Sequence, residues 1–133
     1  KSANGKKDFW ARGDGWVLAG LAKVLQDMPK DYKHYQFFVD KFQKLAKAVA
    51  EIQQPEGYWT RSMMDPEHAP GPETSGTAFF TYGMLWGVNN GYLNQKEYKK
   101  AREPFQDRPW MPTLRPTSVW EPCFSPLVNM INI

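Results

Sequence analysis

Cysteine is nearly absent from this chain, since Cys123 is the single one among 133 residues. One cysteine excludes an internal disulfide framework and a zinc site built mainly from cysteine. Long apolar runs are also missing, because no stretch approaches the roughly 20 apolar residues that a membrane-spanning helix needs. The sequence therefore predicts no disulfide-stabilised fold, no membrane span and no membrane partner.

Strong charge of one sign is missing as well. The 17 basic and 14 acidic residues leave a net charge of +3, and the basic residues are scattered along the chain. Nucleic-acid-binding proteins typically carry a dense basic patch, so no nucleic-acid partner is expected. The two histidines, His34 and His68, lack the spacing of helical metal ligands, and there is no glycine-rich phosphate loop. Neither a metal nor another cofactor is expected.

The chain does contain clear helical periodicity. Apolar residues recur at steps of three and four over residues 14–28, and more plainly over residues 34–54. We expect Asp14 to cap the first of these helices and Pro29 to end it. The residues expected to face the core are Trp16, Leu18, Ala19, Leu21, Ala22 and Leu25 in the first helix, and Tyr35, Phe38, Val39, Phe42, Leu45, Ala46, Val49 and Ile52 in the second.

A third helix is predicted from a cap at Thr74 or Ser75 to about Asn90. Its residues are apolar nearly all round, which is typical of a helix that is buried on every side. Gly91 is expected to end it in the left-handed conformation. No segment has the alternating period of a strand, so the fold class is all-α.

Two further segments lie outside these helices. Residues 55–73 contain four prolines and are predicted to form a long structured loop, a type of segment that often carries function. Asn94 and Glu97 form a capping pair that predicts a short fourth helix through about Ala101.

The composition changes abruptly after Ala101. Residues 102–133 contain neither glycine nor alanine, and their prolines prevent any helix longer than a turn or two. We therefore divide the chain into a helical part, residues 1–101, and an irregular proline-rich tail, residues 102–133. One interpretation of this composition is an ordered, proline-rich extension that packs on the helical part.

Residues 9–16, FWARGDGW, hold the densest group of side chains that suit chemistry. Trp10 and Trp16 offer flat faces to the C–H side of a sugar ring, while Arg12 and Asp14 suit its hydroxyl or carboxylate groups. An equally supported alternative is a buried turn, with both tryptophans in the core and Arg12 paired to Asp14. The residues alone leave these two interpretations open.

A second polar helix start contains Glu73, Thr74 and Ser75. These residues are candidates for substrate binding, and the structural alternative is that they only cap the helix and allow close packing at Gly76. Asp14 and Glu73 are candidates for a glycosidase carboxylate pair. Loop residues that are candidates for the rim of a pocket are Tyr58, Trp59, Arg61, Asp65 and His68.

Several sequence blocks, in this order, resemble the unsaturated rhamnogalacturonyl hydrolases of glycoside hydrolase family 105, which is related to family 88. The blocks are FWARGDGW at residues 9–16, QQPEG at 53–57, PETSGTAFFTY at 72–82 and WGVNNG at 86–91. The resemblance covers residues 8 to about 101. It implies that these residues are part of an (α/α)6 barrel with both polar helix starts at the mouth of the active site.

The family hydrates the C4–C5 double bond of an unsaturated uronyl residue with an aspartate as general acid and base and no metal. The resemblance implies that a galacturonyl-rhamnose oligosaccharide from pectin is the substrate. It also implies that the catalytic aspartate lies upstream of this chain, which leaves Asp14 and Glu73 as the candidates within it. Asparagine is more common in the family at the position of Asp14. The expected substrate-binding residues are Trp10, Arg12, Asp14, Trp16, Trp59, Glu73, Thr74 and Ser75.

The resemblance leaves three hypotheses open. The chain is a fragment of such an enzyme, or a non-catalytic helical module that binds carbohydrate, or a degenerate and inactive product. Lys1 at the start and the missing signal peptide favour the middle of a longer protein. A few helices of a ring of twelve leave apolar faces uncovered, so we expect self-association through these faces. The cytoplasm and the periplasm of a bacterium both remain open as compartments.

The tail acquires a second interpretation from the resemblance. In a reading frame slipped by one nucleotide, the codons of residues 109–122 permit a glycine- and alanine-containing string that resembles the closing segment of the family. We therefore interpret residues 102–133 as the product of a frameshift near Arg102.

Overall fold

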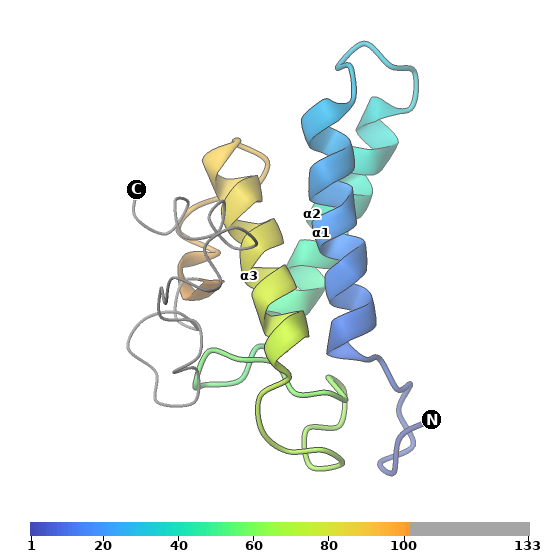
Figure 1. Ribbon diagram of the computed structural model, residues 1–133, viewed down its shortest axis with the longest axis vertical. Coiled ribbons are helices and arrows are strands. Elements are labelled where there is room, and N and C mark those ends of the chain that lie inside the picture. Colours follow the sequence, from blue (N-terminus) through green and yellow to red (C-terminus); the bar gives the residue numbers. More distant parts are fainter. Residues whose placement is uncertain (102–133) are drawn as a thin grey trace, which may run out of the picture.

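The computed structural model describes residues 1–101, and these contain three long helices (Figure 1). They are α1 (Ala11–Asp27), α2 (Tyr35–Glu51) and α3 (Thr74–Asn89). The described part holds no strand, only an isolated antiparallel bridge between Trp10 and Ser62. The all-α prediction is confirmed. Helices α1 and α3 run in the same direction, and α2, which lies between them in the sequence, runs in the opposite direction (Figure 1). The starts of α1 and α3 therefore lie at the same end of the molecule.

Helix α1 begins at Ala11, three residues before the predicted cap. The backbone N–H of Ala11 donates to the carbonyl oxygen of Arg61 at 3.0 Å, so the loop satisfies an amide that would otherwise lack a partner. The amide of Asp14 donates to the carbonyl of Trp10 at 3.1 Å. The prediction that Asp14 caps the helix is therefore wrong, since Asp14 lies within the first turn and Trp10 is the capping residue. The end before Pro29 is as predicted.

Helix α2 has the predicted amphipathic pattern. Its buried residues Val39, Phe42, Ala46 and Val49 follow steps of three and four, which places them on one face. Their burial confirms this part of the predicted core. The remaining predicted residues of this face, Tyr35, Phe38, Leu45 and Ile52, are partly buried and pack against the core.

Helix α3 is apolar nearly all round and largely buried, as predicted. Its capping residue is Glu73, whose carboxylate accepts from the amide of Gly76, and neither Thr74 nor Ser75 caps the helix. A carboxylate suits a helix start because it satisfies free N–H groups and opposes the positive end of the helix dipole. Gly91 follows the helix with a φ of 77°, in the predicted left-handed conformation.

Glycines let α1 and α3 pack in close contact. A Cβ added to Gly76 would lie 2.5 Å from the backbone carbon of Ala11, and one added to Gly83 would lie 2.8 Å from Cγ of Leu18. A Cβ on Gly15 would lie 3.0 Å from Cβ of Phe79. Real side chains do not fit at the first two distances, so only glycine permits this approach. The contact brings the first turns of both helices together.

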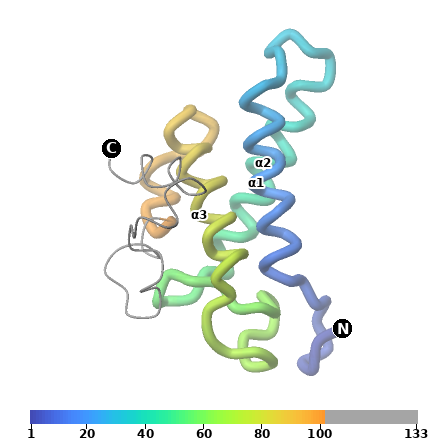
Figure 2. The backbone as a smooth tube through the Cα atoms, viewed as in Figure 1, coloured from blue at the N-terminus to red at the C-terminus, as the bar shows by residue number. Residues whose placement is uncertain are grey.

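The connecting segment from residue 52 to 73 passes the starts of α1 and α3 (Figure 2). Trp59 fixes it to the helices, because its indole N–H donates to the carbonyl of Val49 at 2.8 Å and its ring contacts Phe80 with centroids 5.1 Å apart. The amide of Glu73 also donates to the carbonyl of Trp59 at 2.8 Å. The prediction of a long structured loop agrees with these contacts.

The predicted fourth helix does not form. The amides of Glu97 and Tyr98 both donate to the carbonyl of Asn94, and the Asn94 side chain accepts from the amide of Lys96 at 2.9 Å. These bonds make a turn, and a single 3₁₀ turn at residues 99–101 follows it. The capping pair is therefore a turn signal here, because so short a segment cannot repay the cost of starting an α-helix. The tail, its frameshift interpretation and Cys123 lie outside the described residues.

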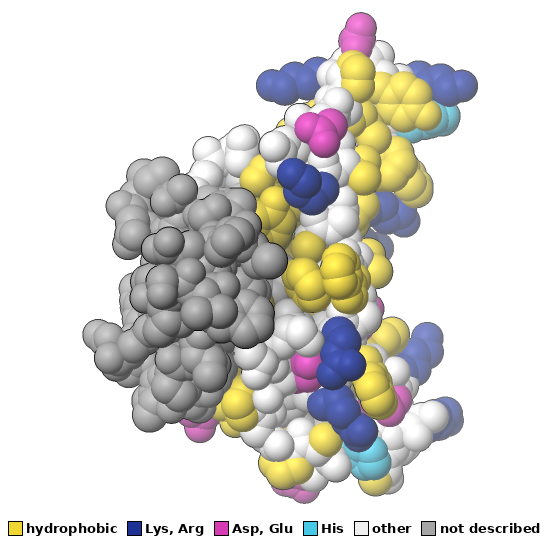
Figure 3. All heavy atoms as spheres, viewed as in Figure 1, with side chains coloured by type: hydrophobic (Ala, Val, Ile, Leu, Met, Phe, Trp, Pro, Cys, Tyr) yellow, Lys and Arg dark blue, Asp and Glu magenta, His cyan; other side chains and the backbone are white. Residues whose placement is uncertain are grey.

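Apolar side chains remain exposed on the α1–α2 hairpin. They include Val17 and Val24 of α1 and Phe37 of α2. Yellow apolar side chains are visible along this side of the molecule in Figure 3. Self-association through these faces stays a prediction.

We expect Gly76→Ala to destabilise the fold by about 2 kcal/mol, because the new methyl group overlaps the backbone of Ala11 and forces the helices apart. Gly20→Ala is the matched control, since a Cβ at Gly20 meets nothing within 4 Å. This control should raise stability by about 0.5–1 kcal/mol through its higher helix propensity. Urea unfolding followed by circular dichroism measures both changes, and equal effects at the two positions would contradict the close contact.

The N-terminal segment depends on Asp65, whose buried carboxylate accepts from the Ser2 hydroxyl at 2.5 Å and from the Asn4 amide at 3.0 Å. These hydrogen bonds hold the pKa of Asp65 below its usual 3.8. The stabilisation is therefore fully present above pH 3.8 and is lost as the pH falls through the lower pKa of the folded state.

We expect Asp65→Asn to lower the melting temperature at neutral pH, because the charge-assisted hydrogen bonds become weaker. The difference from the unsubstituted chain should shrink as the pH falls below 3.8 through the lower pKa of the folded state, where Asp65 itself becomes protonated. Thermal melts over this pH range test the prediction. A difference that stays constant with pH would show that the charge of Asp65 contributes nothing.

Candidate functional site

The starts of α1 and α3 form one surface, and the candidate residues of both lie on or beside it. Ala11 packs on Gly76, the loop at Arg61 pairs with Ala11, and Glu73 precedes the first turn of α3. Figure 3 shows basic side chains next to apolar and acidic ones over the start of α1. We call this surface the helix-start face. The expectation that both polar helix starts lie together agrees with the geometry.

Arg12 and Glu73 form the polar centre of the helix-start face. The Arg12 Nη2 lies 3.3 Å from Oε1 of Glu73, and the Arg12 Nε donates to the Ser75 hydroxyl oxygen at 3.2 Å. The Ser75 hydroxyl donates to the same Glu73 oxygen at 2.6 Å. The Glu73 side chain is 10% exposed and that of Arg12 is 59% exposed. The alternative that pairs Arg12 with Asp14 is therefore wrong.

Both tryptophans of the FWARGDGW block are accessible. Trp16 is 62% exposed and Trp10 is 46% exposed, so the alternative in which both are core residues is wrong. Trp16 lies against Phe79 of α3 with ring centroids 4.4 Å apart and an angle of 41° between the rings. Arg12 and Trp16 are four residues apart and therefore lie on the same side of α1. An exposed aromatic ring beside a charged side chain is the arrangement that a sugar requires.

Asp14 lies on a different side of α1, because residues two positions apart on a helix do not face each other. It is half-buried, and burial raises the pKa of the Asp14 carboxyl above its usual value. Its side chain makes no hydrogen bond to another residue among 1–101. Glu73 differs, since its carboxylate accepts from Arg12, Ser75 and Gly76.

Trp59 was expected at the rim of a pocket, but its side chain is completely buried. It is held between the end of α2 and α3 by the contacts described above, so a substrate has no access to its ring. Trp59 does lie in the predicted loop, but its ring faces the core instead of a pocket rim. Asp65 is likewise buried, whereas Thr74 is exposed at the first position of α3.

Asp8 is a site residue that the sequence did not reveal. One of its carboxylate oxygens accepts from the Ser62 hydroxyl at 2.6 Å and the other from the Trp10 indole N–H at 3.4 Å. The hydrogen bond from Ser62 contributes most to lowering the pKa of Asp8. Ser62 is distant in sequence, so the only available signal was an aspartate directly before the aromatic pair.

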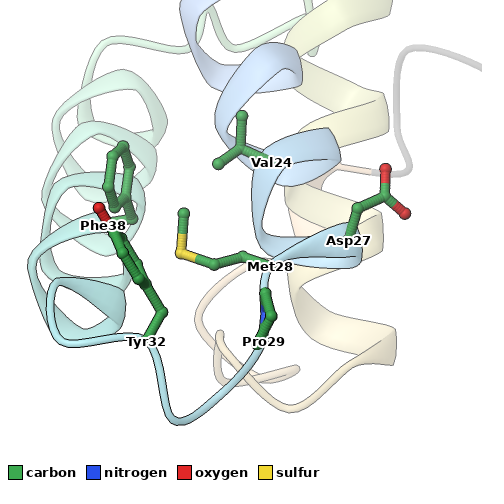
Figure 4. A pocket seen from close by; sticks show the side chains of 6 residues that line it. All are labelled: Val24, Asp27, Met28, Pro29, Tyr32 and Phe38. Carbon is green, nitrogen blue, oxygen red and sulfur yellow. The ribbon is translucent and has the colours of Figure 1, made fainter.

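A separate open groove of about 440 Å³ lies at the other end of α1 (Figure 4). Met28 points across it toward Tyr32, while the carboxylate of Asp27 points away from them (Figure 4). None of the candidate site residues lines it. Its lining residues are Val24, Asp27, Met28, Pro29, Tyr32 and Phe38.

Residues 1–101 contain no candidate metal centre and no candidate membrane-spanning helix. No group of three or more histidine, cysteine, aspartate or glutamate side chains in this part is arranged to hold a metal ion. None of its helices combines the length and the apolar character that crossing a membrane requires.

The chain is similar to two curated proteins named unsaturated 3S-rhamnoglycuronyl hydrolase. The protein from Formosa agariphila is 46% identical over 101 residues, which cover 76% of this chain and 27% of that protein. The protein from an Alteromonas species is 39% identical over 103 residues, or 77% of this chain and 25% of that protein. The chain thus spans about a quarter of the length of these relatives.

Solved structures share the fold. A protein described as glycosyl hydrolase family 88 from Bacteroides vulgatus is 60% identical, with a TM-score of 0.74 over 76% of this chain and 30% of that one. A protein described as a polysaccharide lyase is 63% identical, with a TM-score of 0.77 over 83% of this chain and 33% of that one. A family 105 glycoside hydrolase from C. acetobutylicum is 25% identical, with a TM-score of 0.69 over 76% and 29%.

These neighbours agree with the predicted resemblance to families 105 and 88. Residues 1–105, most of the chain, match the sequence profile described as Glycosyl Hydrolase Family 88. The chain therefore belongs to glycosyl hydrolase family 88.

Proposed function

We propose that the helix-start face binds the unsaturated uronyl residue of a pectin-derived galacturonyl-rhamnose oligosaccharide, and that the protein hydrates its C4–C5 double bond. The observation that carries this proposal is the meeting of two helix starts that groups two exposed indoles with Arg12. Family membership supports the glycoside hydrolase class. The names of the two curated relatives support an unsaturated uronyl substrate.

In this reaction a proton adds to C4 and a water oxygen adds to C5 of the uronyl ring. The resulting hemiketal opens to a ketone at C5 and a hemiacetal at C1, which then releases the next sugar as an alcohol. Trp10 and Trp16 provide apolar faces for the C–H side of the sugars. Arg12, Glu73, Thr74 and Ser75 provide donors and acceptors for hydroxyl groups.

A general acid must hold a proton near neutral pH, and this requirement separates the two candidate carboxyls. Asp14 has a raised pKa because it is half-buried, and no described residue occupies its oxygens. The carboxylate of Glu73 already accepts hydrogen bonds from three donor groups, those of Arg12, Ser75 and Gly76. Within residues 1–101, Asp14 is therefore the better candidate for the acid, and Glu73 is a binding residue.

A second function is carbohydrate binding without catalysis. The chain covers only about a quarter of the length of the curated relatives, and it exposes both indoles. These two observations favour binding without catalysis. The two functions share the helix-start face and differ in whether the double bond is consumed.

We expect the purified chain to reduce the ultraviolet absorbance of an unsaturated galacturonyl-rhamnose disaccharide, because hydration removes the conjugated double bond.

Trp16→Ala should weaken binding of this disaccharide about tenfold, because the sugar loses its contact with the aromatic ring. Asp14→Asn should lower turnover about a hundredfold or more, as expected for loss of a general acid. Lys23→Gln, an exposed change on α1 whose partner is Gln26, serves as the control and should leave both unchanged.

Each other outcome has a distinct meaning. Turnover that persists in both Asp14→Asn and Glu73→Gln would place the acid at another residue. Tryptophan fluorescence that responds to the disaccharide without any turnover, and no longer responds in Trp16→Ala, would favour the binding function. A chain that neither binds nor converts the disaccharide would contradict the proposal.

A further inference from the structure

The charge of Arg12 is already compensated within the helix-start face. Its guanidinium bonds to the carboxylate of Glu73 and to the hydroxyl oxygen of Ser75. Glu73 is only 10% exposed, and Arg12 is the cation that pairs with this carboxylate beside the start of α3. A substrate carboxylate that approached Arg12 would have to compete with Glu73.

Arg61 is a second arginine on the same face, and its backbone position is fixed. Its carbonyl oxygen accepts from the amide of Ala11 at 3.0 Å, and the amide of Met63 donates to the carbonyl of Phe9 at 3.0 Å. These two bonds flank the bridge between Trp10 and Ser62. The loop that carries Arg61 is therefore attached directly to the start of α1.

The Arg61 side chain contacts Trp10 but bonds to no carboxylate. Its guanidinium carbon lies 4.8 Å from the centroid of the Trp10 ring, within the range of a cation–π contact. Its Nε is buried and has no hydrogen-bond partner among residues 1–101. A guanidinium that contacts an aromatic ring through its face keeps its in-plane N–H groups available for oxygen atoms.

The charged groups around Arg61 leave its charge uncompensated. Asp8 interacts with it electrostatically but forms no ion pair with it in the described part of the chain. The two oxygens of Asp8 instead accept from Ser62 and from the Trp10 indole. His68 also lies close enough to Asp8 to affect it electrostatically. Arg61 is thus a half-buried cation beside an exposed indole, and it forms no ion pair with a carboxylate among residues 1–101.

We propose that Arg61, held in place by Trp10, binds the carboxylate of the uronyl residue and so determines the specificity for an acidic sugar. The inference rests on the proposed function, because it names the residue that recognises the charged group of that substrate. Arg12, which is paired with Glu73, then contacts hydroxyl groups of the sugar instead of its carboxylate. The exposed part of Trp10 contacts the same sugar while its indole N–H remains bonded to Asp8.

Galacturonate and its methyl ester test this assignment without any chemistry at a double bond. Isothermal titration calorimetry on the full chain should give about tenfold weaker binding of galacturonate by Arg61→Gln than by the unsubstituted chain, as expected for loss of a charge-assisted hydrogen bond. The methyl ester, which lacks the charge, should bind equally to both. Arg12→Gln removes the same charge nearby and is the matched control, with a smaller effect on galacturonate.

Circular dichroism identifies a variant that fails to fold. In that case Asp8→Asn provides the test, because removing this negative charge near Arg61 should strengthen the binding of galacturonate and not that of the ester.

Three outcomes would overturn the assignment of Arg61. In the first, the unsubstituted chain binds galacturonate and its methyl ester with equal affinity. In the other two, Arg61→Gln keeps the full preference for galacturonate, or it loses the same amount of affinity for both ligands. Failure of the proposed function would look different. In that case the chain binds galacturonate through Arg61 but does not hydrate the unsaturated disaccharide. This result supports the role of Arg61 and contradicts the proposed reaction.

Discussion

The contact between Ala11 and Gly76 is the constraint on which the rest of the described structure depends. No side chain fits between these two backbones, so the first turn of α1 lies directly on the first turn of α3. This contact places Arg12 within reach of Glu73 and Trp16 against Phe79. Two segments about 60 residues apart in the sequence thereby form one surface, and the long loop completes it through hydrogen bonds to both helices.

Electrostatics gives the two arginines of this surface different roles. Arg12 is exposed and paired, whereas Arg61 is half-buried and bonds to no carboxylate among the described residues. Exposure by itself would have favoured Arg12 as the ligand-binding cation. The relevant quantity is the charge left over after intramolecular pairing, because a carboxylate partner offsets part of the positive charge that would attract a second carboxylate.

The large groove at the far end of α1 shows why size alone does not identify a functional site. Its lining is apolar apart from Asp27, whose carboxylate points away from the hollow in Figure 4. The helix-start face collects aromatic, basic and acidic side chains from three segments. Recognition of a charged sugar requires these convergent polar groups more than it requires volume.

The sequence by itself determined the three long helices, most of their buried faces and the blocks that carry the family resemblance, because apolar periodicity acts within a few residues. It did not determine which aromatic rings are buried: the residues left Trp16 open between the core and a sugar-binding surface, and it is exposed, while Trp59 was expected at a rim and is buried. Only the tertiary structure decided this, since burial of a ring depends on a segment distant in sequence. The same holds for the choice of Glu73 over Asp14 as the partner of Arg12, and for the start of α1, which a loop carbonyl fixes.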